Sequence, residues 1–215
     1  PLSVFEQSAD RQTFGHRFHH PQAIELARAE DYAEALNEAW VVVDPDRRQR
    51  RIVEQVERAA KDFGGQALID DGLVEEVTAL VEWPVGIAGR FDERFLVLPR
   101  EVLISTLQEH QRYFPIENEA GELLAGFITV ANIESRDVAQ VIAGNERVVR
   151  PRLSDALFFW DQDRRQGLAH HIDGLARVTF QQSLGSLADK SARIAKAGER
   201  LVEPTGASAS AVKRA

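Results

Sequence analysis

The most regular pattern of apolar positions lies between residues 45 and 63. Apolar side chains recur there at three- and four-residue spacing, at Ile52, Val53, Val56, Ala59 and Ala60. This period predicts an amphipathic helix. Asp44 and Pro45 are typical of a helix start, and the glycines at 64 and 65 are typical of a helix end. A helix is therefore expected over residues 45–63.

The same method predicts further elements up to residue 131. Strands are expected at 12–18, 40–44, 113–117 and 123–131, and the last two form a two-strand unit joined by a turn at 119–121. Helices are expected at 21–39, 72–81 and 99–110. A hairpin is expected over 85–99, after the Trp83–Pro84 pair. This alternation of strands and helices favours an α+β fold built on a mixed sheet.

The pattern changes beyond residue 135. Apolar positions at helical spacing fill 138–163 and 187–202, with almost no strand signal. We therefore expect a mixed α+β domain over 1–135 and a mainly helical extension over 136–215, truncated at its C-terminus. The chain has no methionine, and its last residues look like the opening of another helix. We interpret the chain as a piece of a longer protein.

Composition narrows the range of functions. No run of about 18 apolar residues occurs, so neither a transmembrane helix nor a membrane partner is expected. The chain has no cysteine, which excludes disulfides and thiolate chemistry and is typical of a cytoplasmic protein. The net charge of −8 argues against general attraction to nucleic acid. Four basic residues are lysines and the other 22 are arginines, which suits phosphate binding but equally reflects a GC-rich genome.

Motifs for catalysis and for cofactor binding are missing. The sequence has no nucleophile elbow and no glycine-rich phosphate loop, so we expect no catalytic residue and no bound cofactor in this chain. His16, His19 and His20 invite a metal interpretation, but no carboxylate lies beside them. The pair His170–His171 with Asp173 is equally weak evidence for a metal site. We expect no metal site.

Two arginine clusters are candidates for phosphate contacts. RRQRR at 47–51 spreads around a predicted helix, which favours a solvated face over a phosphate site. Between residues 145 and 165, Arg147, Arg150 and Arg152 surround Pro151. Three aspartates nearby could pair with them, at Asp155, Asp161 and Asp163. A buried arginine–aspartate network and an RNA contact explain this cluster equally well.

A third candidate lies where a predicted helix meets a strand, at Gln111, Arg112 and Tyr113. Junctions of this kind often carry function. Tyr113 and Phe114 alternate faces, so one of them is expected in the core. Gln111, Arg112 and one aromatic ring could reach a backbone phosphate or stack on a base.

Six stretches together resemble the beta subunit of bacterial glycyl-tRNA synthetase, in that family's order and across nearly the whole chain. They are TFGHRF at 13–18, LVEWPVGIAGRFDERFLVLPREVL at 80–103, HQRYFPI at 110–116, FITVAN at 127–132, GNERVVRPRLSDALFFWDQD at 144–163 and LGSLADKSARI at 184–194. Agreement of several long motifs is far more specific than any single short pattern.

The resemblance implies a heterotetrameric ligase that joins glycine to tRNA-Gly. It implies that the alpha subunit carries the catalytic core with its ATP and Mg2+, while the beta subunit supplies most of the tRNA recognition. The RNA-contact residues expected here are Gln111, Arg112, Tyr113, Arg147, Arg150 and Arg152. The mixed domain is also similar to the editing-type domain of phenylalanyl-tRNA synthetase beta subunits. Two alternatives remain: a subunit-docking module without RNA contact, and a residual deacylase of mischarged tRNA.

Overall fold

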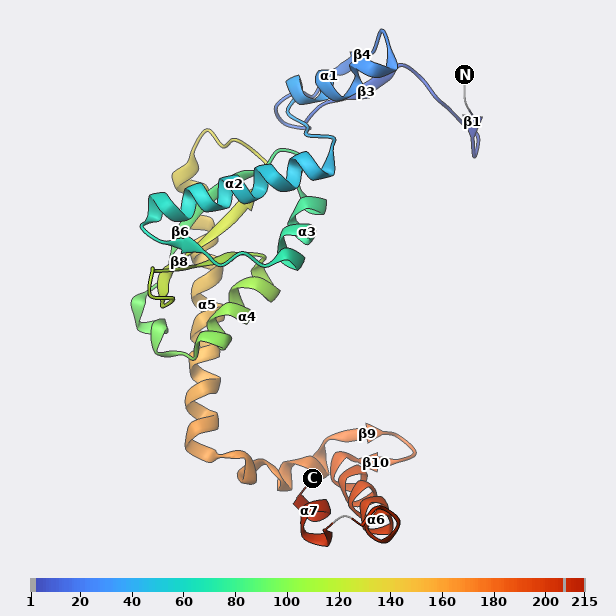
Figure 1. Cartoon of the computed structure of the whole chain (residues 1–215), viewed down its shortest axis with the longest axis vertical. Coiled ribbons are helices and arrows are strands. Elements are labelled where there is room, and N and C mark those ends of the chain that lie inside the picture. Colours follow the sequence, from blue (N-terminus) through green and yellow to red (C-terminus); the bar gives the residue numbers. More distant parts are fainter. Residues whose placement is uncertain (1–2, 207, 215) are drawn as a thin grey trace. The chain divides into compact units, whose positions relative to one another are not determined.

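The structure is a computed structural model that describes residues 3–206 and 208–214. It contains two compact units, one ending at Leu157 and the other beginning at Phe158. Helices and strands alternate along the first unit, which confirms the α+β class (Figure 1). Every strand pairing in the described residues is antiparallel, so the sheet is not mixed.

A four-stranded sheet forms the centre of the first unit. Its strand order is β5 (Gln66–Ala67), β7 (Phe114–Glu117), β8 (Leu123–Ala131) and β6 (Val85–Arg90). The predicted β7–β8 hairpin is confirmed. The predicted hairpin over 85–99 is wrong, because β6 pairs instead with the distant β8, and η2 (Glu93–Val97) is a 3-10 helix.

Four helices of this unit agree with the sequence pattern. They are α2 (Pro45–Phe63), α3 (Asp71–Leu80), α4 (Arg100–Gln111) and α5 (Val138–Gln166), the last of which continues into the second unit. The start of α2 is capped by Asp44, whose Oδ1 accepts the backbone N–H of Arg47 at 3.0 Å. That hydrogen bond holds the pKa of Asp44 below its usual value. Gly64 ends α2 in the left-handed conformation, at φ 104°.

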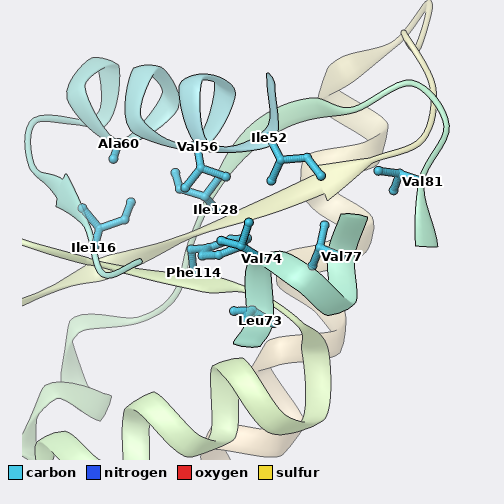
Figure 2. Close-up of a cluster of buried hydrophobic side chains, with 10 residues drawn as sticks. All are labelled: Ile52, Val56, Ala60, Leu73, Val74, Val77, Val81, Phe114, Ile116 and Ile128. Carbon is cyan, nitrogen blue, oxygen red and sulfur yellow. The ribbon is translucent and has the colours of Figure 1, made fainter. Parts of the chain in front are cut away.

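The main hydrophobic core lies between α2, α3 and one face of the sheet. Figure 2 shows α2 directing apolar side chains toward the strands, with α3 packed beside them. The buried members are Ile52, Val56, Ala60, Leu73, Val74, Val77, Val81, Phe114, Ile116 and Ile128. The apolar stripe predicted for 45–63 is thus the stripe that packs on the sheet.

The opposite face of the sheet is also covered. Phe127 and Ile128 are consecutive in β8, so their side chains point to opposite faces, and both are fully buried. Tyr113 stacks on Phe127, at 4.6 Å between ring centroids. Tyr113 and Phe114 are both buried. The expectation that only one of these two rings enters the core is wrong, because the sheet has a core on each face.

The N-terminal segment departs most from prediction. β1 (Ser3–Val4) pairs with β2 (Gln7–Ser8), and β3 (Gln12–Phe14) pairs with β4 (Ala23–Glu25). The predicted helix at 21–39 is therefore helical only in its second half, in η1 (Ala29–Asp31) and α1 (Tyr32–Glu38).

The apolar run at 40–44 is not a strand. Arg48 donates from Nη1 to the carbonyl oxygens of Val42 and Val43, at 2.6 and 3.2 Å. The Val42 N–H donates to the Glu82 carbonyl at 2.9 Å. A side chain therefore satisfies the backbone carbonyls that a sheet ladder would otherwise bind.

The second unit contains η3 (Leu168–His171), η4 (Asp173–Arg177), α6 (Leu187–Thr205) and α7 (Ala209–Arg214). A short hairpin, β9 (Thr179–Gln181) and β10 (Gly185–Ser186), precedes α6. Ser186 and Asp189 form a reciprocal capping box at the start of α6. The predicted helix at 187–202 is confirmed.

The close approach of β6 to α2 depends on Gly86. A Cβ at this position would lie 2.6 Å from the backbone oxygen of Gln55. We expect Gly86→Ala to destabilise the first unit by about 1–3 kcal/mol, because the helix must shift away from the sheet. Gly144→Ala in α5 is the control: its Cβ meets nothing within 4 Å, and alanine gains up to about 1 kcal/mol of helix propensity. Urea midpoints measure both, and equal midpoints would contradict this account.

Candidate nucleic-acid interface

The helix–strand junction places Arg112 in the left-handed conformation, at φ 57°, where it ends α4. Its Nη1 donates to the Glu109 carbonyl at 2.8 Å, and its Nε donates to Glu76 Oε1 at 2.7 Å. Glu109 is a local partner, whereas Glu76 comes from α3, and the Arg112 side chain remains exposed. Gln111, the last residue of α4, is half-buried. The junction therefore presents one exposed guanidinium, that of Arg112, which is paired with the carboxylate of Glu76.

Tyr113 has a different environment from its neighbours. Its side chain is 5% exposed, and its hydroxyl donates to Asn145 Oδ1 of α5 at 2.6 Å. Asn145 in turn donates from Nδ2 to the Val141 carbonyl at 2.7 Å. Burial raises the pKa of Tyr113 above its ordinary value. Tyr113 therefore holds α5 against the sheet, through a phenol that stays neutral.

The three arginines predicted in α5 are all exposed. A buried arginine–aspartate network, one of the two explanations left open by the sequence, is therefore wrong, since no arginine of the cluster is buried. They do not share one face of the helix. Arg147 and Arg150 lie three residues apart and are neighbours, whereas Arg152 lies nearly opposite Arg150. Arg152 instead lies on the side of Asn145, two turns further along α5.

Arg150 lines a cavity of about 610 Å3 within the first unit. We call it the arginine cavity, and its lining residues are Arg90, Phe91, Asp92, Arg94, Phe95, Glu146 and Arg150. They come from the end of β6, from the turn into η2 and from α5. The Arg90 N–H donates to Glu146 Oε1 at 2.9 Å, which joins β6 to α5 at the edge of the cavity.

Sequence reasoning missed Arg90 and Arg94. Both lie in the stretch expected to be a local hairpin, which gave no reason to place them beside α5. The only available signal was the run GRFDER, with two arginines four residues apart at the end of an apolar strand. Pairing of β6 with β8 is what brings this run to α5.

An aromatic cluster ties the N-terminal segment to α2 and to the residues before β6. We call it the aromatic clasp: His19, Trp40, Trp83 and Arg51. His19 stacks on Trp40 at 4.4 Å, Trp40 meets Trp83 edge-on at 5.1 Å, and the Arg51 guanidinium lies 3.6 Å from the centre of the Trp83 ring. Trp83 also donates from Nε1 to Glu134 at 3.0 Å.

The clasp corrects the interpretation of RRQRR. Arg48 binds three backbone carbonyls and Arg51 packs on Trp83, so two of its four arginines belong to the fold. Only Arg47 and Arg50 lie on the expected solvated face.

His16 is buried in the fold and has a partner on each ring nitrogen. Its Nδ1 accepts the N–H groups of Phe18 and His19, so Nε2 carries the proton and donates to the Asn132 carbonyl at 2.6 Å. Among the residues that the structure describes, no group of three histidine or carboxylate side chains could hold a metal ion.

Comparison with known proteins decides the family. The sequence matches the family described as glycyl-tRNA synthetase beta subunit over residues 1–215. The chain belongs to this family. It is 51% identical over 215 residues to the glycine–tRNA ligase beta subunit of Chromohalobacter salexigens, covering 100% of this chain and 31% of the relative. The corresponding protein of Acinetobacter baylyi is 48% identical over 213 residues, covering 99% and 31%. That of Azotobacter vinelandii is 47% identical over 203 residues, covering 94% and 30%.

Family membership confirms the resemblance carried by the six motifs. The chain spans less than a third of the length of these curated relatives. Much of the motif sequence lies in the core, including Phe114, Phe127, Ile128, Val149 and Leu153. Within the described part of the chain, no helix is long and apolar enough to cross a membrane.

The Tyr113 hydroxyl gives a direct test of how α5 is held. Tyr113→Phe removes the donor to Asn145 and leaves a half-buried amide oxygen unpaired, so we expect a loss of about 1 kcal/mol in unfolding free energy. Tyr32→Phe is the control, since Tyr32 is 41% exposed. Urea unfolding measures both variants. A Tyr113→Phe midpoint equal to the wild-type value would mean that this hydrogen bond contributes nothing.

The raised pKa of Tyr113 predicts a pH dependence at the alkaline end. The chain has two tyrosines, so in Tyr32→Phe only Tyr113 titrates as a phenol. Its near-ultraviolet absorbance should change at higher pH in the folded chain than in urea. The neutral phenol is the form that the fold favours, so this stabilisation is complete below about pH 10 and is lost as pH rises through the folded pKa. Coincident folded and unfolded titrations would refute it.

Proposed function

We propose that this chain is the part of a glycine–tRNA ligase beta subunit that contributes to tRNA-Gly recognition and to subunit scaffolding. The observation that carries the proposal is the family match over the whole chain, with 51% identity to a glycine–tRNA ligase beta subunit. The proposed role is non-catalytic. ATP and Mg2+ serve the ligase on its alpha subunit, and this chain holds neither. Its partners are the alpha subunit and tRNA-Gly, and its location is the cytoplasm.

The proposed RNA surface uses exposed cations of the first unit. Arg147, Arg150 and Arg152 project from α5, and Arg112 lies at the end of α4 beside Gln111. Arginine forks bind phosphate oxygens well, and they do so locally even when the net charge of the chain is −8. We assign Tyr113 a supporting part: it positions α5 and does not itself stack on a base, because its ring is buried.

A subunit-docking role is supported by a separate observation. Phe158 and Phe159 lie edge to face at 5.5 Å, and they are 58% and 62% exposed. Exposed aromatic pairs of this kind are typical of protein–protein contacts. Docking and RNA contact are compatible on one chain. A chain that assembles with the alpha subunit but binds no RNA would be a docking module alone.

The likeness to the editing-type domain of phenylalanyl-tRNA synthetase beta subunits is a proposal about fold. Its functional counterpart, a residual deacylase, has less physical motivation. A pocket for glycine excludes every larger side chain by steric overlap, so a second hydrolytic step gains little. Incubation of the chain with alanyl-tRNA measures this activity directly.

Binding of tRNA-Gly to the chain at several salt concentrations tests the proposed function. We expect affinity to fall as salt rises, and to exceed that for an unrelated tRNA, because phosphate contacts release counterions. Replacing Arg147, Arg150 and Arg152 by glutamine should weaken binding. The salt slope should also fall by about one unit for each phosphate that the variant no longer neutralises.

The matched control is glutamine at Arg47, Arg50 and Arg58, three exposed arginines of α2. Both triple variants remove the same charge. Equal loss of affinity in the two would indicate general electrostatics in place of specific contacts by the α5 arginines. Absence of wild-type binding at low salt would refute RNA recognition by this chain.

A further inference from the structure

Three arginines from three separate elements line the arginine cavity. Arg90 ends β6, Arg94 lies in η2 and Arg150 lies in α5. Arg90 and Arg94 are four residues apart, whereas Arg150 is distant in sequence, and tertiary packing of α5 brings it to the same cavity. Arginines that serve only to keep a surface soluble have no reason to gather around one cavity.

The cavity is also unbalanced in charge. Its two carboxylates already have partners inside the fold. Glu146 accepts the Arg90 backbone N–H, and Asp92 accepts the Arg94 backbone N–H at 3.0 Å while lying 3.6 Å from its Nε. In the described residues no ion pair engages Arg90 or Arg150. The lining therefore has three arginines against two carboxylates, an excess of one positive charge, and Asp92 pairs with one of those arginines, Arg94.

Two of the guanidinium groups are held in place before any ligand arrives. The Arg90 guanidinium lies 4.2 Å from the centre of the Phe63 ring, and that of Arg94 lies 4.7 Å from the centre of the Phe95 ring. Phe95 is fully buried, so it forms a fixed platform. Stacked arginines lose less side-chain entropy when they bind an anion.

We infer that the arginine cavity binds a single phosphate group. Guanidinium forks match phosphate oxygens, and a cavity of about 610 Å3 admits a phosphate together with the atoms attached to it. We assign the phosphate to the backbone of a bound RNA. That assignment of source rests on the proposed function, whereas the phosphate chemistry does not.

Two variants and one matched control test the inference. Arg94→Gln and Arg150→Gln each remove one cation from the cavity, and Arg90 is left intact because it packs on Phe63. Arg47→Gln is the control, an exposed arginine outside the cavity. Calorimetric titration with inorganic phosphate should show at least about tenfold weaker binding for each cavity variant, the loss expected for one charged hydrogen bond. The control should bind as wild type does, and urea midpoints confirm that all variants fold.

The same variants are then titrated with tRNA-Gly. A salt slope lower by about one unit in each cavity variant, together with displacement of tRNA by phosphate, supports the RNA backbone as the source. If the cavity variants lose phosphate binding but bind tRNA-Gly as wild type does, the assignment to an RNA backbone is overturned. The cavity is then a site for free phosphate or for a phosphorylated small molecule.

Failure of the inference is distinct from failure of the proposed function. Absence of phosphate binding by wild type, or equal binding by the cavity variants, overturns the cavity site even if tRNA-Gly binds. Phosphate binding that depends on Arg94 and Arg150, in a chain that binds no tRNA, supports the site and overturns the proposed RNA role.

Discussion

Two adjacent residues in β8 impose the main constraint on this fold. Phe127 and Ile128 point to opposite faces of the sheet, and both are fully buried, so each face must be covered. On the face of Ile128 the cover is α2 and α3. On the face of Phe127 the stacked ring of Tyr113 leads through its hydroxyl to α5. Burial of both faces is therefore what brings α5, with its exposed arginines, to the Phe127 face of the sheet.

The abundance of arginine has two explanations in the structure. One group serves the fold itself. Arg48 satisfies backbone carbonyls, Arg51 packs on Trp83, and Arg100 pairs with Glu117 at 2.7 Å. The other group is exposed and faces solvent or the arginine cavity. A planar guanidinium with several donors suits both tasks, so arginine content alone could not separate structural cations from ligand-binding ones.

Local signals predicted the parts of the fold that are determined locally. Capping by Asp44 and the glycine at 64 defined α2 to the residue, and the turn at 119–121 defined the β7–β8 hairpin. Pairing of β6 with β8 joins distant segments, and no local pattern carries it. The run at 40–44 looked like a buried strand because its side chains are apolar. Nothing nearby indicated that the Arg48 side chain would satisfy its carbonyls.

The candidate site was predictable to a similar extent. The sequence placed Arg147, Arg150 and Arg152 on a helix, as the structure does, but left their burial open, and it singled out Tyr113 at the junction of α4 and β7. Its role could not be inferred, because the Asn145 partner lies on an element whose placement is tertiary. Arg90 and Arg94 could not be found for the same reason: their relation to Arg150 exists only after β6 has joined the sheet.

The hydrogen bond between Tyr113 and Asn145 also sets the rotational phase of α5. A helix turns by about 100° for each residue, so a slip of one position along α5 would carry Arg150 well away from the cavity. The hydroxyl of Tyr113 and the backbone N–H of Arg90 contact consecutive residues, Asn145 and Glu146, and together they allow a single phase. An insertion or deletion in α5 before residue 145 moves Asn145, Glu146 and the arginines together. An insertion or deletion between residues 146 and 150 changes the spacing between Glu146 and Arg150. The number of residues between Glu146 and Arg150 is therefore fixed, because a change of one residue would turn Arg150 away from the arginine cavity.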